Sequence, residues 1–151
     1  MWNSAITAYL HYLGFMLSVG ALSIEHFAVK EQPTLKESKR IVIADVVYGL
    51  GALTVLVTGV LRVLYFGKGT EYYTSNPIFW IKVGLFLFIG ALSLYPTVTF
   101  ILWARDLQQG QAPVLTEQKT KIITSIVRFE LFGFLLLPLL AAMMARGIRL
   151  F

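Results

Sequence analysis

Cysteine is absent from this sequence of 151 residues. Its absence excludes disulfides, iron–sulfur clusters, thiolate-bound zinc, a cysteine nucleophile and a covalently attached c-type haem. Charged residues are also scarce, because they make up 14% of the chain whereas soluble domains carry about 25%. Hydrophobic residues make up 57%, and the mean hydropathy is +0.72. A chain with so little polar surface is typical of a protein embedded in a lipid bilayer.

Four long apolar stretches divide the chain. A helix needs about 20 predominantly apolar residues to cross the hydrocarbon core of a membrane. Stretches of this length predict helices at about residues 5–25, 41–66, 78–104 and 122–146. The connecting segments contain proline, glycine or charged residues, and none is long enough to form a separate domain. Because every backbone polar group in lipid must be paired internally, we expect one all-α domain, an antiparallel bundle of four transmembrane helices.

Lysine and arginine are unevenly distributed between the two ends of these stretches. The first and third connections and their flanks hold Lys30, Lys36, Lys39, Arg40, Arg105, Lys119 and Lys121. The opposite side holds Arg62, Lys68, Arg146 and Arg149. We attribute the formal net charge of +5 to orientation and to contact with anionic lipid headgroups, not to nucleic acid. The positive-inside rule then predicts that both termini lie outside the cytoplasm.

Charged residues within the predicted helices are informative, because a charge in hydrocarbon is costly and usually faces the bundle interior or a water-filled cavity. Alternating helix directions bring His11, Arg62 and Lys82 to a similar depth, and Met143 and Met144 end the fourth helix on that side. Helix bundles commonly hold haem between facing helices, and histidine is a usual axial ligand. His11 is therefore a candidate ligand to haem iron. The second ligand would be Met144, Met143 or Lys82, or would be absent. Arg62 and Lys82 are candidate partners of the haem propionates.

Simpler roles explain the same residues. A neutral His11 would hydrogen-bond to a neighbouring helix, and Arg62 and Lys82 would extend their charges to the lipid headgroups. The second histidine, His26, lies 15 residues from His11. At 1.5 Å per residue this is about 22 Å along a helix, so the two histidines cannot ligate one iron from the same helix.

The opposite half of the predicted bundle holds a second polar group, Glu25, His26, Asp45, Arg128 and Glu130. Acids and bases are mixed here, and this mixture predicts either structural ion pairs or a charge relay. Arg128 and Glu130 are two positions apart and therefore point to different faces of a helix. Glu25 and His26 would alternatively lie in the membrane interface with no chemical role.

Three segments resemble a group of small bacterial membrane proteins. They are the region from His11 to Lys30, the basic segment ESKR at 37–40, and NPIFWIKVGLFLFIGALSLYP at 76–96. The chain is similar to an uncharacterised family of predicted membrane proteins of about this length, common in bacteria and especially cyanobacteria. More distantly, it resembles the HemJ-type protoporphyrinogen oxidases. This resemblance implies a multi-pass protein of a bacterial inner membrane or a thylakoid.

The distant resemblance also implies haem b, porphyrin and oxidoreductase activity, although few residues carry it. His11 matches the histidine that these oxidases have in their first helix. Trp80 and Lys82 match part of a motif that opens the third helix, but the histidine of that motif is missing. Where the oxidases have a Tyr-His pair, this chain has Tyr95 and Pro96.

Three functions stay open. The first is a haem b-binding redox protein or porphyrin oxidase-like enzyme. The second is a non-catalytic membrane subunit or assembly factor that binds a partner subunit or a second copy through a small-residue face of the second helix, Gly49, Gly51, Ala52 and Gly59. The third is a small transporter or an ion or proton pathway, which requires a water-filled path between the two polar groups. Phosphate loops, HExxH zinc motifs and nucleophile elbows are absent from the sequence.

Overall fold

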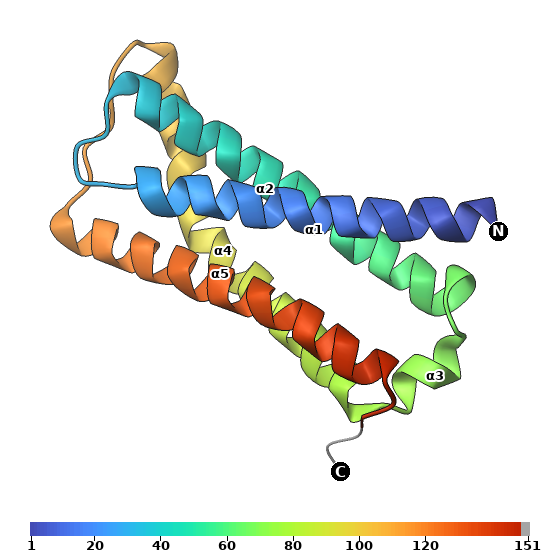
Figure 1. The fold of residues 1–151 in the computed structure, drawn as a ribbon. Coiled ribbons are helices and arrows are strands. Elements are labelled where there is room, and N and C mark those ends of the chain that lie inside the picture. The colour runs from blue at the N-terminus through green and yellow to red at the C-terminus, as the bar shows by residue number, and fades with distance from the viewer. Residues whose placement is uncertain (149–151) are drawn as a thin grey trace.

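Long antiparallel helices form the protein, whose structure is a computed structural model describing residues 1–148 (Figure 1). They are α1 (Trp2–Ala28), α2 (Leu35–Leu61), α4 (Pro77–Gln108) and α5 (Glu117–Ala145). A π-helical turn, η1 (Arg62–Phe66), extends α2, and the short helix α3 (Thr70–Thr74) precedes α4. All four long helices are long and apolar enough to cross a membrane. The predicted fold class, an all-α bundle of four transmembrane helices, is confirmed.

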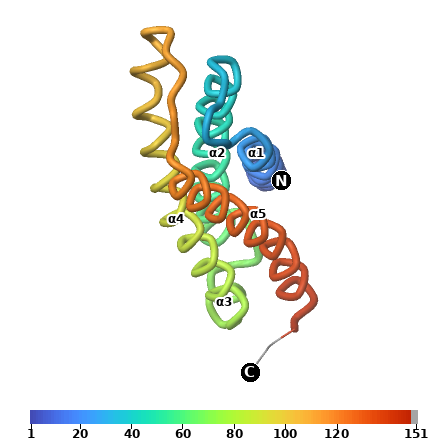
Figure 2. The backbone as a smooth tube through the Cα atoms, turned by 90° about the vertical axis from the view of Figure 1, so that its left-hand side faces the viewer, coloured from blue at the N-terminus to red at the C-terminus, as the bar shows by residue number. Residues whose placement is uncertain are grey.

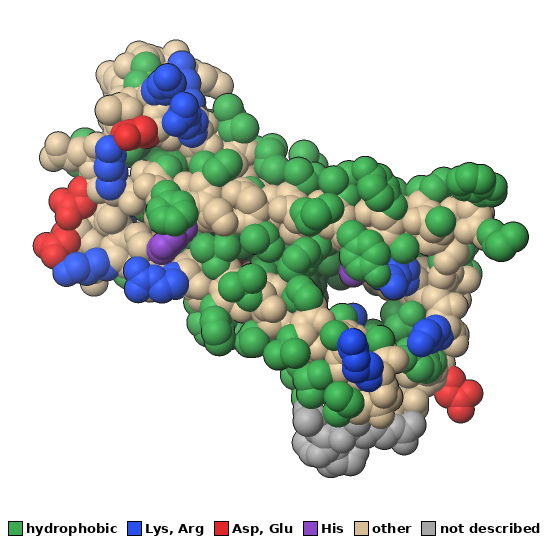
Figure 3. Space-filling view, in the orientation of Figure 1, with side chains coloured by type: hydrophobic (Ala, Val, Ile, Leu, Met, Phe, Trp, Pro, Cys, Tyr) green, Lys and Arg blue, Asp and Glu red, His purple; other side chains and the backbone are tan. Residues whose placement is uncertain are grey.

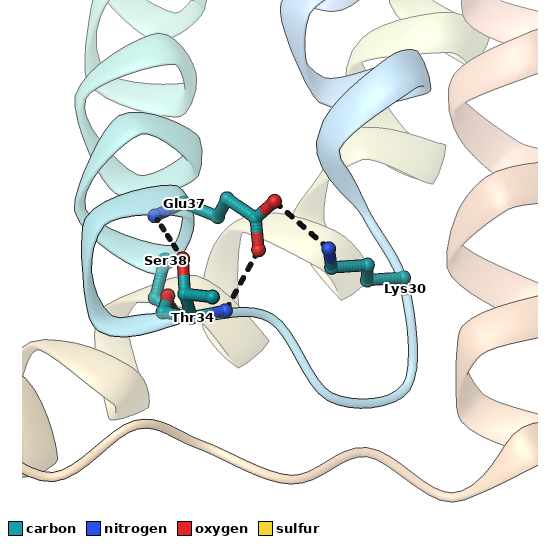
Figure 4. A network of polar contacts seen from close by, with 4 residues as sticks. All are labelled: Lys30, Thr34, Glu37 and Ser38. Carbon is teal, nitrogen blue, oxygen red and sulfur yellow. Dashed lines mark hydrogen bonds and ion pairs between the residues drawn. The ribbon is translucent and has the colours of Figure 1, made fainter.

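The long helices extend beyond their apolar stretches, because polar residues cap their first turns. In α2, the hydroxyl of Thr34 accepts from the N–H of Glu37, and the carboxylate of Glu37 accepts from the N–H of Thr34, forming a capping box (Figure 4). In α5, the hydroxyl of Thr116 accepts from the N–H of Lys119. The second and fourth helices therefore begin earlier than hydrophobicity predicts. Helix α3 lies in a segment that the sequence predicts as a loop.

The helices pack as two antiparallel pairs. Helix α1 packs along α2 and α4 packs along α5, while the α2–α4 and α1–α5 contacts are less extensive. The connections 29–34 and 109–116 lie together at one end, here called the loop end, where the N–H of Leu115 donates to the carbonyl of Glu31 at 2.9 Å. The N-terminus, α3 and the end of α5 lie at the opposite end, here called the terminal end. The two pairs separate toward the terminal end (Figures 1 and 2).

Glycine allows α1 and α2 to cross closely. A Cβ atom added at Gly14 would lie 2.8 Å from the carbonyl oxygen of Gly51, and one added at Gly51 would lie 2.6 Å from Oγ of Ser18. Small residues at such positions let helix backbones approach each other. Gly51, which the sequence offers as part of a partner-binding face, therefore packs within the bundle. An added Cβ at Gly49 would instead meet open space.

Aromatic side chains from all four long helices meet in the middle of the bundle. Phe134 is fully buried, and its ring centroid lies 5.8 Å from that of Phe15, 6.0 Å from Tyr48 and 6.2 Å from Phe86. These distances are typical of favourable aromatic pairs. The four residues, here called the aromatic plug, fill the bundle between its two ends.

Because α1 and α2 cross closely at Gly51, a large side chain there should lower stability more than the same side chain at Gly49. We expect Gly51→Leu to lower the free energy of unfolding in detergent by about 1–3 kcal/mol, because an overpacked interface must shift to admit the side chain. Gly49→Leu is the matched control, since its Cβ has open space, and it should leave stability nearly unchanged. Chemical unfolding followed by circular dichroism measures both values. Equal losses in the two variants would contradict the observed crossing.

Candidate functional site

His11 is held in one orientation by α2. Its Nδ1 lies 2.9 Å from the hydroxyl oxygen of Thr58, and that hydroxyl donates its own proton to the carbonyl of Thr54. Thr58 is therefore the acceptor, and His11 donates from Nδ1–H. When the imidazole is neutral, this tautomer leaves a free lone pair on Nε2. Gly59 makes room for the ring, since a Cβ added there would lie 3.4 Å from Cε1 of His11.

Two cations lie close to this imidazole. Arg62 and Lys82 are near enough for their charges to act on the His11 ring and, in the case of Arg62, on Lys82. The guanidinium of Arg62 lies 5.6 Å from the ring centroid of Tyr12, and the ammonium of Lys82 lies 5.9 Å from that of Phe79. Within residues 1–148 neither cation forms a salt bridge; the ion pairs found there are Lys30–Glu37 and Lys121–Glu117.

A hollow opens between the two helix pairs at the terminal end. Figure 3 shows that it is bordered by a histidine and by basic side chains, with hydrophobic side chains around them. Here an imidazole with one nitrogen hydrogen-bonded lies near two cations that form no ion pair within residues 1–148, in apolar surroundings. These features suit an apolar ligand that carries negative groups. We call His11, Thr58, Arg62 and Lys82 the terminal-end site.

Met144 does not join this site. Its side chain is 6% exposed and packs in an apolar cluster with Tyr73, Ile78 and Phe79. The hydroxyl of Tyr72 donates to the Met144 carbonyl at 3.1 Å, which holds the end of α5 against α3. The sequence places Met144 at the correct end of the bundle, but the structure uses it to pack α3, α4 and α5 together.

Three carboxyl groups are buried in the other half of the bundle. The exposed fractions of Glu25, Asp45 and Glu130 are 1%, 6% and 0%. Thr97 of α4 donates to Oδ1 of Asp45 at 2.7 Å, and the hydroxyl of Tyr48 donates to Oε1 of Glu130 at 3.3 Å. We call these three carboxyls the acidic cluster.

The ion pairs expected among these residues do not form. In the described part of the chain, Oε1 of Glu25, Oε2 of Glu130 and Nδ1 of His26 have no hydrogen-bond partner. Arg128, the expected basic partner, is exposed. The reason is helical geometry, because two positions along a helix rotate a side chain by about 200°. Glu130 therefore faces the interior, and Arg128 faces away from it.

The aromatic plug separates the terminal-end site from the acidic cluster. On α1, Phe15 lies between His11 and Glu25. On α5, the fully buried Phe134 follows Glu130 by about one turn. The rings of the plug therefore lie on the route that a relay between the two groups would take.

Hydroxyl residues are the partners that sequence analysis missed. Thr58 orients His11, and Thr97 contacts Asp45, but neither stands out among apolar neighbours. A signal existed for Thr58, since it lies four residues before Arg62 and so on the same helix face. The signal for Thr97 is weaker, because only its position after Pro96, inside a helix, marks it.

Comparison with known proteins identifies the family. The model of the family described as “Predicted membrane protein (DUF2214)” matches residues 3–149, and the chain belongs to this family. The expected similarity to an uncharacterised family of predicted membrane proteins is thereby confirmed. No curated protein and no solved structure matches the chain.

Glu25 is buried, and its Oε1 has no hydrogen-bond partner in the described part of the chain. Replacing Glu25 with an apolar residue should therefore raise stability. We expect Glu25→Met to raise the free energy of unfolding in detergent by about 1–3 kcal/mol, because a buried polar group without a partner costs that much. Arg128→Met, at an exposed position of α5, should change it by less than about 0.5 kcal/mol. Chemical unfolding measures both. A clear loss of stability in Glu25→Met would show that Glu25 has a stabilising partner.

Proposed function

We propose that this member of the predicted membrane protein family is a haem b-binding redox protein, a membrane oxidoreductase in which His11 would bind the haem iron. One observation carries the proposal. The hydrogen bond from Nδ1 of His11 to Thr58 leaves Nε2 free, and this is how an iron-ligating histidine is held when a second group fixes its tautomer and ring orientation.

The other groups of the terminal-end site fit the same cofactor. Haem b is a flat apolar ring with two propionates, and carboxylates form strong charge-assisted hydrogen bonds with arginine and lysine. Arg62 and Lys82, which form no salt bridge within residues 1–148, would hold those propionates. The hollow between the helix pairs (Figure 3) would receive the ring. Met144 is not part of the proposal, because its side chain packs in the apolar cluster with Tyr73, Ile78 and Phe79.

Haem bound there would supply one-electron chemistry. The chain contributes the orientation of His11 through Thr58, two positive charges, and the aromatic plug, which limits access of water from the loop end. Low water access around a metal site is one of the ways in which a protein tunes redox potential. The resemblance to HemJ-type oxidases that the sequence suggests at His11 and Lys82 would imply a porphyrin as the substrate class, and no match to a curated protein supports it.

The alternatives have less support. A proton pathway is favoured by the unpartnered oxygens of Glu25 and Glu130, but the aromatic plug interrupts its route. A non-catalytic subunit would use the small-residue face of α2, yet Gly51 and Gly59 already pack against α1.

The haem proposal predicts a spectroscopic signature. Protein purified in detergent, either directly or after incubation with haem, should show a Soret band. We expect His11→Ala to abolish or shift this band, because it removes the ligand. Arg62→Gln and Lys82→Gln should each weaken haem binding, by about tenfold for the loss of one charge-assisted bond.

His26→Ala is the matched control, since His26 is the other histidine of the chain and lies in the opposite half of the bundle. This variant should keep the band of the parent protein. The proposal fails if no band forms with added haem, or if His26→Ala removes it while His11→Ala does not.

The loop end faces the cytoplasm of a bacterium in this proposal, because more lysines and arginines gather there. The natural lack of cysteine makes this testable with single cysteines. In intact cells, a membrane-impermeant maleimide should label Lys68→Cys near the terminal end. It should label Lys36→Cys at the loop end only after the cells are opened. The reverse pattern would invert the orientation.

A further inference from the structure

An apolar groove runs along the outer surface of the α1–α2 pair. Its volume is about 520 Å³, and a second hollow of about 400 Å³ shares Ile24 and Arg40 with it. The two hollows therefore adjoin each other, and together they are called the groove here. Its walls are mainly apolar and come from both helices, including Met16, Gly20, Ile24, Arg40, Ile43 and Val47.

The part of the groove between Arg40 and Met16 covers most of the length of one leaflet. Its α1 wall runs from Met16 to Ile24, and at 1.5 Å per residue this is about 12 Å. Half of a hydrocarbon core of about 30 Å is about 15 Å. Gly20 keeps the groove open, because a Cβ added there would meet nothing within 4 Å. Met16 and Ile43 are 57% and 63% exposed, so the walls open toward lipid.

Positive charge lies where the headgroup would be. Arg40 is exposed and lines both hollows, so it lies where they meet, and the hollow on its loop-end side is also lined by Glu37. Arg40 forms no salt bridge in the described chain, whereas its acidic neighbour Glu37 pairs with Lys30 at 2.8 Å (Figure 4). The guanidinium is therefore available, and its planar fork of donors suits phosphate. Lys36 and Lys39, in the same region of α2, add positive charge.

We propose that this groove is a binding site for one anionic phospholipid of the leaflet at the loop end. One acyl chain lies along Gly20 between α1 and α2, and the phosphate contacts Arg40. Charge complementarity selects an acidic headgroup over a zwitterionic one, and the apolar walls hold the chain by burying its surface. The site is separate from the terminal-end site and does not depend on the haem proposal.

Native mass spectrometry of the detergent-purified protein tests the site. The protein is incubated with an equimolar mixture of phosphatidylglycerol and phosphatidylcholine. We expect one bound phosphatidylglycerol, retained in preference to phosphatidylcholine. Arg40→Gln should lower its retention about tenfold, the effect of one charge-assisted contact, whereas Lys39→Gln should lower it much less.

Gly20→Leu tests the acyl part of the groove. It places a side chain where the lipid chain lies, without a clash in the free protein, and should abolish the adduct. Gly90→Leu on α4 is the matched control, because Gly90 is also exposed and an added Cβ there meets nothing within 4 Å. This variant should keep the lipid. Circular dichroism and gel filtration verify that both variants fold.

Several results would overturn the proposal. Equal retention of the two lipids by the parent protein would show ordinary, non-selective lipid contact. Unchanged retention in Gly20→Leu would place any bound lipid elsewhere. A dimer of the parent protein that Gly20→Leu converts to a monomer would show that a second copy, not a lipid, covers this face.

Discussion

The absence of hydrogen-bond partners in hydrocarbon governs this structure. Helices satisfy their backbone groups internally, and most hydroxyl groups within the helices do the same. Ser18, Ser23 and Thr54, for example, each donate to the carbonyl four residues earlier on their own helix. Against this background, an imidazole bound to another helix and buried carboxyl oxygens without partners, one on Glu25 and one on Glu130, are exceptions. A buried polar atom without a partner costs stability. Such exceptions mark the places where function is to be sought.

The two halves of the bundle are chemically different, and the aromatic plug lies between them. The terminal-end site combines His11 with Arg62 and Lys82 beside a hollow between the helix pairs. The other half closes around the acidic cluster, with a hydroxyl donor for Asp45 and another for Glu130. A ligand at the terminal end therefore meets positive charge, and packed rings keep it apart from the acids.

The α1–α2 pair presents a different surface on each side. Its inner side holds His11 against Thr58 and Gly59, and its outer side carries the groove that Arg40 lines. The close crossing at Gly14 and Gly51 joins the two helices between these features. A lipid in the outer groove would contact the same helices that hold His11. The lipid site and the terminal-end site therefore both lie on the α1–α2 pair.

The sequence by itself determined the four long helices, their order and their antiparallel alternation, because hydrophobicity over about 20 residues is a local property that decides whether a segment enters lipid. It also determined which residues lie at which depth, including His11, Arg62 and Lys82. Only the tertiary structure decided the partners. Thr58 meets His11 across 47 positions, Arg128 turns away from the acids, and Met144 packs against α3 and α4. These outcomes depend on how each helix is rotated about its axis, and that rotation is set by contacts between helices that no local pattern specifies.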